Sequence, residues 1–372
     1  MRIGVPKEIK DNEFRVGLIP SSVAELVHHG HSVTVESGAG LGAGSSDADY
    51  AEAGATIAPE AAAIFRDAEM IVKVKEPLSA ERKRLRPGQI LFTYLHLAPD
   101  LDQTRDLLAS KAVCIAYETV TSPTGALPLL TPMSEVAGRL APQVGAHSLE
   151  KAQGGLGILL GGVPGVPAAD VVILGGGVSG THAATIAVGM GAKVTVVDRS
   201  AETLKRLAAQ FGTSISTVFS TRAAIAALVR KADLLIGTVL VPGAAAPKLV
   251  TRDMVRTMKK GAVIVDVAID QGGCVETSHS TTHSDPTYVV DGVVHYCVAN
   301  MPGAVARTST FALNNVTLPF AVALADKGWK AALAADAHLR NGLNVCDGRI
   351  TCAPVAEAHG LDFIDTMAAI GG

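Results

Sequence analysis

The stretch VVILGGGVSG, residues 171–180, joins an apolar run to a glycine-rich turn. Gly175, Gly177 and Gly180 have the spacing G-x-G-x-x-G, directly after the apolar run and at the start of a helical pattern. Asp198 stands about 20 residues further on, at the end of the next expected strand. Because all these features occur in order, the stretch predicts a dinucleotide-binding βαβ unit rather than an ordinary glycine-rich turn.

Each glycine of this stretch has its own physical task in such a unit. Gly175 permits the tight turn, Gly177 lets the backbone approach a pyrophosphate, and Gly180 lets the helix pack on the strand. The phosphates then lie at the positive N-terminus of the helix. Asp198 can accept hydrogen bonds from both ribose hydroxyls, and its charge repels a 2′-phosphate. We therefore expect NAD as the cofactor rather than NADP, although Arg199, which follows directly, works against that preference.

Short apolar runs alternate with helical patterns on both sides of this turn, which indicates an α/β fold with doubly wound sheets. The glycine turn belongs to a sheet of six expected strands, the number in a complete dinucleotide-binding fold: Val171–Leu174, Lys193–Val197, Thr217–Phe219, Asp233–Ile236, Ala262–Val267 and Val293–Val298. An earlier sheet is expected from five runs: Ile3–Pro6, Ser32–Glu36, Ile71–Val74, Ile90–Leu97 and Val113–Tyr117.

The segments around the second sheet are expected to be helical or irregular. A long helix is expected after Met133, with Ser134 as N-cap and Glu135 in the first turn. A glycine- and proline-rich connection then leads into the second sheet. After Arg307 the pattern is helical to the end of the chain, with no further strand. We expect these last helices to pack on the first domain.

Composition limits the remaining choices. A chain of 372 residues with 48% apolar residues suggests two domains, each with its own core. A net charge of −3 with interspersed signs gives no reason to expect nucleic acid or an anionic membrane as partner. We expect no signal peptide and no membrane span. The cysteines form no CxxC pair, which indicates reduced, buried thiols of a cytoplasmic protein: Cys114, Cys274, Cys297, Cys346 and Cys352.

Four ionisable residues are expected at the carboxyl ends of strands, where open α/β sheets bind their ligands. They are Arg15, Lys75, His96 and Asp270. An arginine can hold a carboxylate through two hydrogen bonds, and a lysine can polarise a carbonyl group. A histidine can transfer a proton near neutral pH, and a carboxylate can orient water or ammonia. Together these groups suit a 2-oxo acid placed next to NAD.

Each of the four also has an ordinary explanation. Arg15 could be a surface cation with a packed stem, and Lys75 a solvated residue paired with Glu76. His96 could be a hydrogen-bonded core residue, and Asp270 a turn residue that bonds its own backbone. The shared position at strand ends favours the catalytic interpretation.

Several long motifs resemble the alanine dehydrogenase family in order and spacing, over essentially the whole chain. They are MRIGVPKEIKDNEFRVGLIP, VKVKEP, QILFTYLHLA, AYETV, PLLTPMSEVAGRLA, QGGLGILLGGVPGV, VDVAIDQGGC, TTHSDPTY and YCVANMPGAVARTST. The resemblance implies reversible, NAD-dependent oxidative deamination of L-alanine to pyruvate and ammonia. It also implies a homohexamer, with no metal, and a cofactor domain (129–306) inserted into a split catalytic domain (1–128 and 307–372).

By this likeness, Arg15 and Lys75 bind substrate, and His96 and Asp270 are the catalytic pair. Cofactor contacts are implied, besides the glycines, at Ser134, Val178, Ser179, Asp198, Ser220, Val239, Leu240, Val267, Ala268, Ile269, Asp270, Val298, Ala299, Asn300 and Met301. Two positions depart from the family. Thr203 stands where a basic residue is frequent, with Lys205 and Arg206 close by, and His279 stands where arginine is frequent.

Three other functions are compatible with parts of this pattern. A proton-translocating transhydrogenase contains an NAD-binding part of related fold, but it needs no clamp for an oxo acid. A dehydrogenase of another amino acid, of the saccharopine type for example, would share the cofactor unit. A catalytically silent NAD sensor would need no proton-transferring groups.

Overall fold

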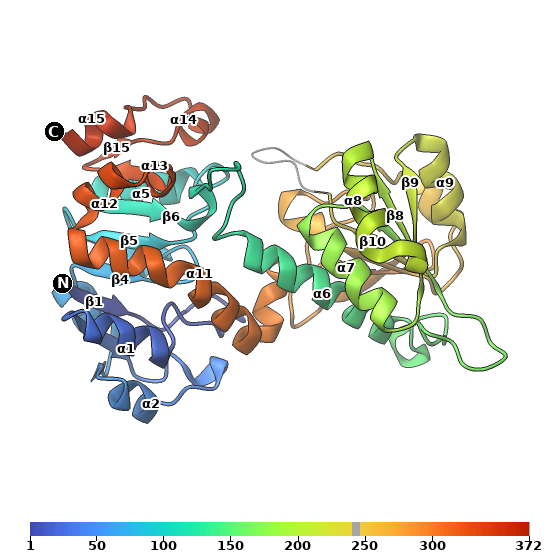
Figure 1. The fold of residues 1–372 in the computed structure, drawn as a ribbon, viewed down its shortest axis with the longest axis horizontal. Coiled ribbons are helices and arrows are strands. Elements are labelled where there is room, and N and C mark those ends of the chain that lie inside the picture. Colours follow the sequence, from blue (N-terminus) through green and yellow to red (C-terminus); the bar gives the residue numbers. More distant parts are fainter. Residues whose placement is uncertain (240–245, 372) are drawn as a thin grey trace. The chain divides into compact units, whose positions relative to one another are not determined.

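The computed structural model describes residues 1–239 and 246–371. The chain divides into two compact units: 1–133 with 305–372, and 134–304. The boundaries expected from the sequence, at 128/129 and 306/307, lie a few residues from these divisions. Each unit contains one sheet with helices packed against it (Figure 1).

The sheet of the first unit has eight strands in the order β15-β14-β6-β5-β4-β1-β2-β3. Its parallel strands are β1 (Arg2–Val5), β2 (Ser32–Glu36), β3 (Thr56–Ala58), β4 (Met70–Val72), β5 (Ile90–Thr93) and β6 (Val113–Ala116). The strand order reverses between β1 and β4, so this is a doubly wound sheet with its switch point there.

Successive residues of these strands enter two different hydrophobic cores, because side chains alternate between the faces of a sheet. Phe92 and Ile115 pack on one face, beside α1 (Pro20–His28), α11 (Ala306–Lys327) and α12 (Trp329–Ala335). Leu91 and Cys114 pack on the other face. That face is covered by α3 (Ala61–Asp67), α5 (Leu101–Ser110) and α14 (Ala353–His359). Burial on both faces explains why these strands are apolar throughout.

The other helices of the first unit are short and lie in the connections. They are α2 (Asp47–Glu52), α4 (Ser79–Arg82), α13 (Ala337–Arg340), α15 (Thr366–Gly371) and the 3₁₀ turns η1 (Leu41–Ala43) and η2 (Tyr117–Thr119). The 3₁₀ turn η6 (Met301–Val305) lies in the second unit except for its last residue.

The sheet of the second unit has the order β12-β13-β11-β10-β7-β8-β9. Its strands are β7 (Asp170–Leu174), β8 (Lys193–Asp198), β9 (Ile215–Phe219), β10 (Leu234–Gly237), β11 (Val263–Asp266), β12 (Thr287–Val290) and β13 (Val293–Tyr296). The six expected strands are all present, with the switch point between β7 and β10. The helices are α7 (Val178–Gly189), α8 (Ala201–Phe211), α9 (Arg222–Lys231) and α10 (Arg252–Arg256), with the 3₁₀ turns η3 (Lys151–Gln153), η4 (Gly212–Ser214) and η5 (Val267–Gln271).

The expectation that no strand follows Arg307 is wrong. β14 (Leu343–Cys346) pairs with β6, and β15 (Arg349–Ile350) pairs with β14, both in antiparallel orientation. A hairpin turn at Asp347 and Gly348, both with positive φ, joins these two strands. Asp-Gly between apolar residues is a strong hairpin signal that the sequence already contained.

The second sheet contains a strand that was also not expected, β12, and the same signal marks it. Asp291 and Gly292 have positive φ and connect β12 to β13 as an antiparallel hairpin. The sheet therefore has seven strands where six were expected. β12, β14 and β15 thus lie at or next to a sheet edge and take part in tight Asp-Gly hairpins. β3 was not expected either, and it pairs in parallel with β2 at the other edge of the first sheet.

The long helix after the first unit starts earlier than expected. α6 (Thr131–Ser148) begins three residues before Ser134, which is therefore inside the helix and not its N-cap. Pro132 stands in the first turn of this helix, a position that tolerates proline because no intrahelical N–H bond is lost there. The helical signal was correct, and only the position of its start was wrong.

The first unit buries a lysine between two glutamates beyond β4. The Lys73 ammonium lies 3.0 Å from a Glu8 oxygen and 2.8 Å from a Glu81 oxygen, and none of these three side chains is more than 2% exposed. Burial alone would lower the pKa of Lys73, but the two carboxylates outweigh it and raise the pKa. Removal of the lysine would leave two carboxylates in the interior without a cation.

Lys73→Met should therefore lower the free energy of unfolding by about 3–5 kcal/mol, the usual effect of breaking a buried ion pair. Lys193→Met is the matched control, because its side chain is 76% exposed and its ammonium lies 3.1 Å from Asp170. The control should lose less than about 1 kcal/mol. Urea unfolding followed by circular dichroism measures both, and equal losses would contradict the account.

Candidate functional site

The first sheet places three of the four candidate residues beyond neighbouring strands. Arg15 follows β1, Lys75 follows β4 and His96 follows β5, and these strands are adjacent in the order β5-β4-β1. The strands are parallel, so the three residues follow the same edge of the sheet. Lys75 and His96 were expected to close their strands. Instead β4 ends at Val72 and β5 at Thr93, so both residues lie in the following loops.

Arg15 is 2% exposed, so the alternative of a surface cation is wrong. Its guanidinium donates from Nε to Glu13 Oε1 at 2.6 Å and from Nη2 to Oε2 at 2.5 Å. Nη1 lies 3.1 Å from the sulfur of Met133. Burial alone would lower the pKa of Arg15, but Glu13 raises it. Glu13 thus fixes the plane of the guanidinium, a role that the sequence did not suggest.

Lys75 is mostly buried, with its side chain 13% exposed, and its ammonium lies 3.7 Å from Glu76 Oε2. The expected pairing with Glu76 is present, but the lysine is not a solvated residue. Glu76 also accepts a hydrogen bond from Lys10. Glu8 accepts the backbone N–H of Lys75 at 3.3 Å, which links this residue to the buried Lys73 pair.

His96 is not a core residue, because 44% of its side chain is exposed. Its backbone has φ of +50°, the left-handed conformation that is uncommon outside glycine. The imidazole ring is parallel to the buried ring of Tyr94, with an angle of 6° and 5.7 Å between centroids. Burial raises the pKa of the Tyr94 hydroxyl, and the positive charge of Arg15 partly offsets this effect.

In the second unit, the three glycines of the motif lie between β7 and the first turn of α7. Gly175 has φ of +101°, which favours glycine. A Cβ on Gly180 would lie 1.8 Å from the carbonyl oxygen of Gly175, so the helix could not approach the strand with any other residue. A Cβ on Gly177 would meet no atom within 4 Å, which leaves open space at the N-terminus of α7.

Asp198 ends β8, and its carboxylate bonds the glycine turn. Oδ2 accepts the N–H of Gly176 at 2.7 Å, and Oδ1 accepts the N–H of Ser200 at 2.7 Å. Arg206 donates to the carbonyl oxygen of Gly176 at 2.7 Å. This cation therefore stabilises the turn from α8. The methyl group of Thr203 lies close to Gly176, so this side chain is apolar toward the turn.

Other expected cofactor residues lie around this turn. Ser179 donates its hydroxyl to the carbonyl oxygen of Ser134 at 2.9 Å. Ser220 donates its N–H to the carbonyl oxygen of Asp198 at 2.9 Å. Val239 follows β10, the neighbour of β7 across the switch point. Leu240 lies outside the residues that the structure describes.

Asp270 lies in η5, directly beyond β11, and is exposed. Its Oδ1 accepts the N–H of Asn300, whose φ is +61°, at 3.3 Å. This contact joins two segments of expected cofactor residues: Val267, Ala268, Ile269 and Asp270, and Val298, Ala299, Asn300 and Met301. The alternative that Asp270 bonds only its own turn is wrong.

A residue that the sequence did not single out, Asp266, stabilises this loop. Its buried carboxylate accepts the N–H of Cys274 at 3.0 Å and the hydroxyl of Ser278 at 2.7 Å. Lys248 donates to the carbonyl oxygens of Gly272 and Gly273. The sequence signal for this role was an aspartate at the end of an apolar strand, in the run VIVD.

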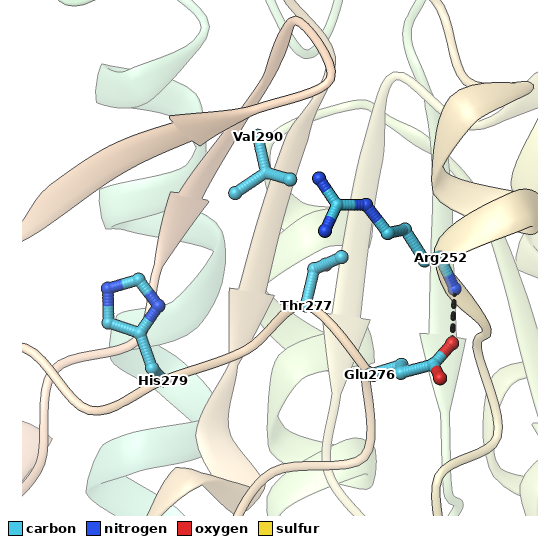
Figure 2. Close-up of a pocket in the computed structure, with 5 residues that line it drawn as sticks. All are labelled: Arg252, Glu276, Thr277, His279 and Val290. Carbon is cyan, nitrogen blue, oxygen red and sulfur yellow. Dashed lines mark hydrogen bonds between the residues drawn. The ribbon is translucent and has the colours of Figure 1, made fainter.

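His279 lies apart from the glycine turn, beside β12. Its ring stacks on Tyr288 with centroids 3.7 Å apart. The pocket at this place has a volume of about 350 Å³ and is lined by Arg252, Glu276, Thr277, His279 and Val290 (Figure 2). The Arg252 guanidinium pairs with Asp291, and its backbone N–H donates to the Glu276 carboxylate.

The cysteines are all free thiols, and four of the five are buried. Burial raises the pKa of Cys297 to about 11. No group of His, Cys, Asp or Glu side chains within residues 1–239 and 246–371 has a geometry that could hold a metal ion. Among the same residues, no helix is long and apolar enough to cross a membrane.

Comparison with known proteins identifies the family. The model of the alanine dehydrogenase/PNT N-terminal domain matches residues 4–137, and that of the C-terminal domain matches residues 141–353. The chain belongs to the alanine dehydrogenase/PNT family. As a member with two Rossmann-like sheets, it is an oxidoreductase that uses a nicotinamide cofactor.

Individual relatives agree with this assignment. The chain is 62% identical to an alanine dehydrogenase of Halomonas elongata over 100% of both chains. It is 54% identical to an alanine dehydrogenase of Mycolicibacterium smegmatis over 98% of both. A solved L-alanine dehydrogenase matches with a TM-score of 0.94 and 55% identity, covering 97% of this chain and 99% of that one. A transhydrogenase from Sinorhizobium meliloti matches with a TM-score of 0.81 and 27% identity, over 95% and 99%.

The glycine turn permits a matched test. Gly180→Ala should lower the free energy of unfolding by about 1–3 kcal/mol or more, because its Cβ collides with the Gly175 carbonyl. Gly177→Ala should change it by less than about 1 kcal/mol, since the new methyl group enters open space. Thermal unfolding of both variants distinguishes them. Two variants that melt together would contradict the packing described here.

Proposed function

We propose that the chain catalyses the reversible oxidative deamination of L-alanine to pyruvate and ammonium with NAD⁺ as the cofactor. The observation that supports this most is the placement of Arg15, Lys75 and His96 beyond three adjacent parallel strands. This set offers a guanidinium, a second cation and a proton-transferring group beyond one edge of the sheet. The names of the relatives at 54–62% identity support alanine as the substrate.

The residues of the second unit fit NAD. The open space at Gly177 and the N-terminus of α7 suit a pyrophosphate, and Asp198 suits the ribose. Ser134, Ser179 and Ser220 lie around the same turn and can donate or accept hydrogen bonds. When bound, NAD⁺ supplies the acceptor for the hydride from the substrate Cα. NAD is favoured over NADP, because a 2′-phosphate would meet the carboxylate of Asp198.

The side chains of the chain do the remaining chemistry. Arg15 holds the substrate carboxylate and so fixes the direction of the Cα–H bond. After hydride transfer, water adds to the resulting imine. His96 and Asp270 take up and return the protons of this water. Lys75 stabilises the negative charge that develops on the oxygen, and the carbinolamine then breaks its C–N bond to give pyruvate and ammonium.

A spectrophotometric assay with L-alanine and NAD⁺ tests the proposal. NADH, pyruvate and ammonium should form in equal amounts. The likeness to the Sinorhizobium transhydrogenase makes hydride exchange between two nucleotides the second candidate function. That activity would proceed without alanine, and a dehydrogenase of another amino acid would show a higher kcat/KM with that amino acid. A silent sensor would bind NAD and produce no NADH.

Arg15→Lys should raise the KM for alanine and pyruvate strongly, with NADH affinity near wild type. Lysine keeps the charge but loses the planar fork that binds a carboxylate, and it also loses the fixed plane set by Glu13. Some fall in kcat should accompany this, because a loosely held substrate misplaces its Cα–H bond. Steady-state kinetics with each substrate varied in turn measures both effects. Equal damage to NADH binding would assign Arg15 to the cofactor or the fold.

Asp198→Ala should weaken NAD binding and reduce the preference for NAD over NADP. The variant removes both the ribose acceptor and the charge that repels a phosphate. Asp253→Ala is the control, because its carboxylate is 88% exposed and pairs with Arg256. Kinetics with NAD and NADP provide the ratio. A preference of the wild type for NADP would contradict the proposal that Asp198 repels a 2′-phosphate.

His96→Ala and Asp270→Asn should each lower kcat by about 100-fold or more, the range for positioned acid–base groups. Their thermal unfolding should change little, because both side chains are exposed. A His96 variant with full turnover and early melting would instead indicate a structural role.

We further propose that the enzyme is a cytoplasmic homohexamer. The free thiols suit a reducing compartment. The assembly follows from the family likeness alone, and sedimentation at several concentrations would determine it.

A further inference from the structure

The motif AYETV contains a glutamate that the mechanism has not used. Glu118 lies in η2, directly beyond β6, which neighbours β5 in the sheet. Its carboxylate accepts the N–H of His96 at 2.6 Å and the N–H of Leu95 at 3.2 Å. The Glu118 side chain itself is 15% exposed.

These hydrogen bonds hold the backbone at His96, which has the unusual left-handed conformation. A residue with a side chain pays about 1–2 kcal/mol to adopt the left-handed conformation found at His96. Such a conformation persists only where surrounding contacts hold it. The His96 N–H donates its hydrogen bond to the Glu118 carboxylate. The exposed position of the imidazole therefore depends on this glutamate.

The same carboxylate also faces the imidazole ring. Glu118 Oε1 lies 3.9 Å from His96 Nδ1, which is an ion-pair distance once the ring is protonated. The parallel ring of Tyr94 restricts rotation of the imidazole. A carboxylate beside Nδ1 orients an imidazole and stabilises its protonated form, while the other ring nitrogen remains available to a reactant.

We propose that Glu118 is the positioning residue of His96, an inference that rests on the proposed function. It fixes the left-handed peptide through its oxygens and places a negative charge 3.9 Å from the imidazole. The proton that His96 takes from the water is returned when the amine leaves, and Glu118 itself takes no proton from the reactants.

A double-mutant cycle tests the role of the charge. Glu118→Gln keeps an oxygen for the two N–H groups and removes the charge. It should lower kcat about tenfold, with KM for alanine within about twofold, as for coupled residues in contact. In the His96→Ala background the same change should have no further effect on kcat. An equal fall in both backgrounds, or no fall in the first, would overturn the proposal.

Amide hydrogen exchange tests the role of the oxygens without any assay of activity. Glu118→Ala should speed exchange at His96, and Glu118→Gln should not. Unchanged exchange in Glu118→Ala would overturn the proposal. Glu25→Gln is the matched control, an exposed glutamate 3.4 Å from His29, and should change neither readout. A wild type without alanine activity would contradict the proposed function, whereas the exchange result would still test the peptide contact.

Discussion

The order of strands in each sheet reverses once, and the helices on either side of that point lie on opposite faces. The carboxyl ends of the central strands are therefore not covered by a connection. In the first unit the reversal lies between β1 and β4, and in the second between β7 and β10. Both sets of candidate residues follow these strands or their neighbours. The positions of the candidate site residues therefore depend on this reversal of strand order.

Placing cations beyond the strands of an apolar sheet requires partners for them. Arg15 is buried with Glu13, and Lys73 is buried with Glu8 and Glu81. Unpaired, each charge would cost several kcal/mol in the interior. The partners also hold other groups in place. Glu13 fixes the plane of the Arg15 guanidinium, and Glu8 accepts a hydrogen bond from the backbone N–H of Lys75. The same carboxylates that neutralise charge thus fix the positions of the groups that are proposed to bind substrate.

Much of the fold was predictable, because periodic apolar runs and the glycine spacing report directly on local structure. Every expected strand of the second sheet is present, and Gly175 and Gly180 have the conformations that their spacing predicted. The edge hairpins at Asp291 and Asp347 were missed although each has an Asp-Gly turn. The roles of Glu13 and Glu118 could not be assigned from the sequence, because they depend on contacts that exist only in the folded chain. The burial of Arg15 likewise follows from tertiary packing and not from its local pattern.

The central claim is that the loops after β1, β4 and β5 bind the oxo acid. The most direct measurement is a crystal structure of the protein with pyruvate and NADH. The account predicts that the pyruvate carboxylate accepts hydrogen bonds from Arg15, with the keto oxygen within hydrogen-bond distance of Lys75 or His96. A carboxylate held by other residues, with Arg15 bonded to Glu13 alone, would contradict it.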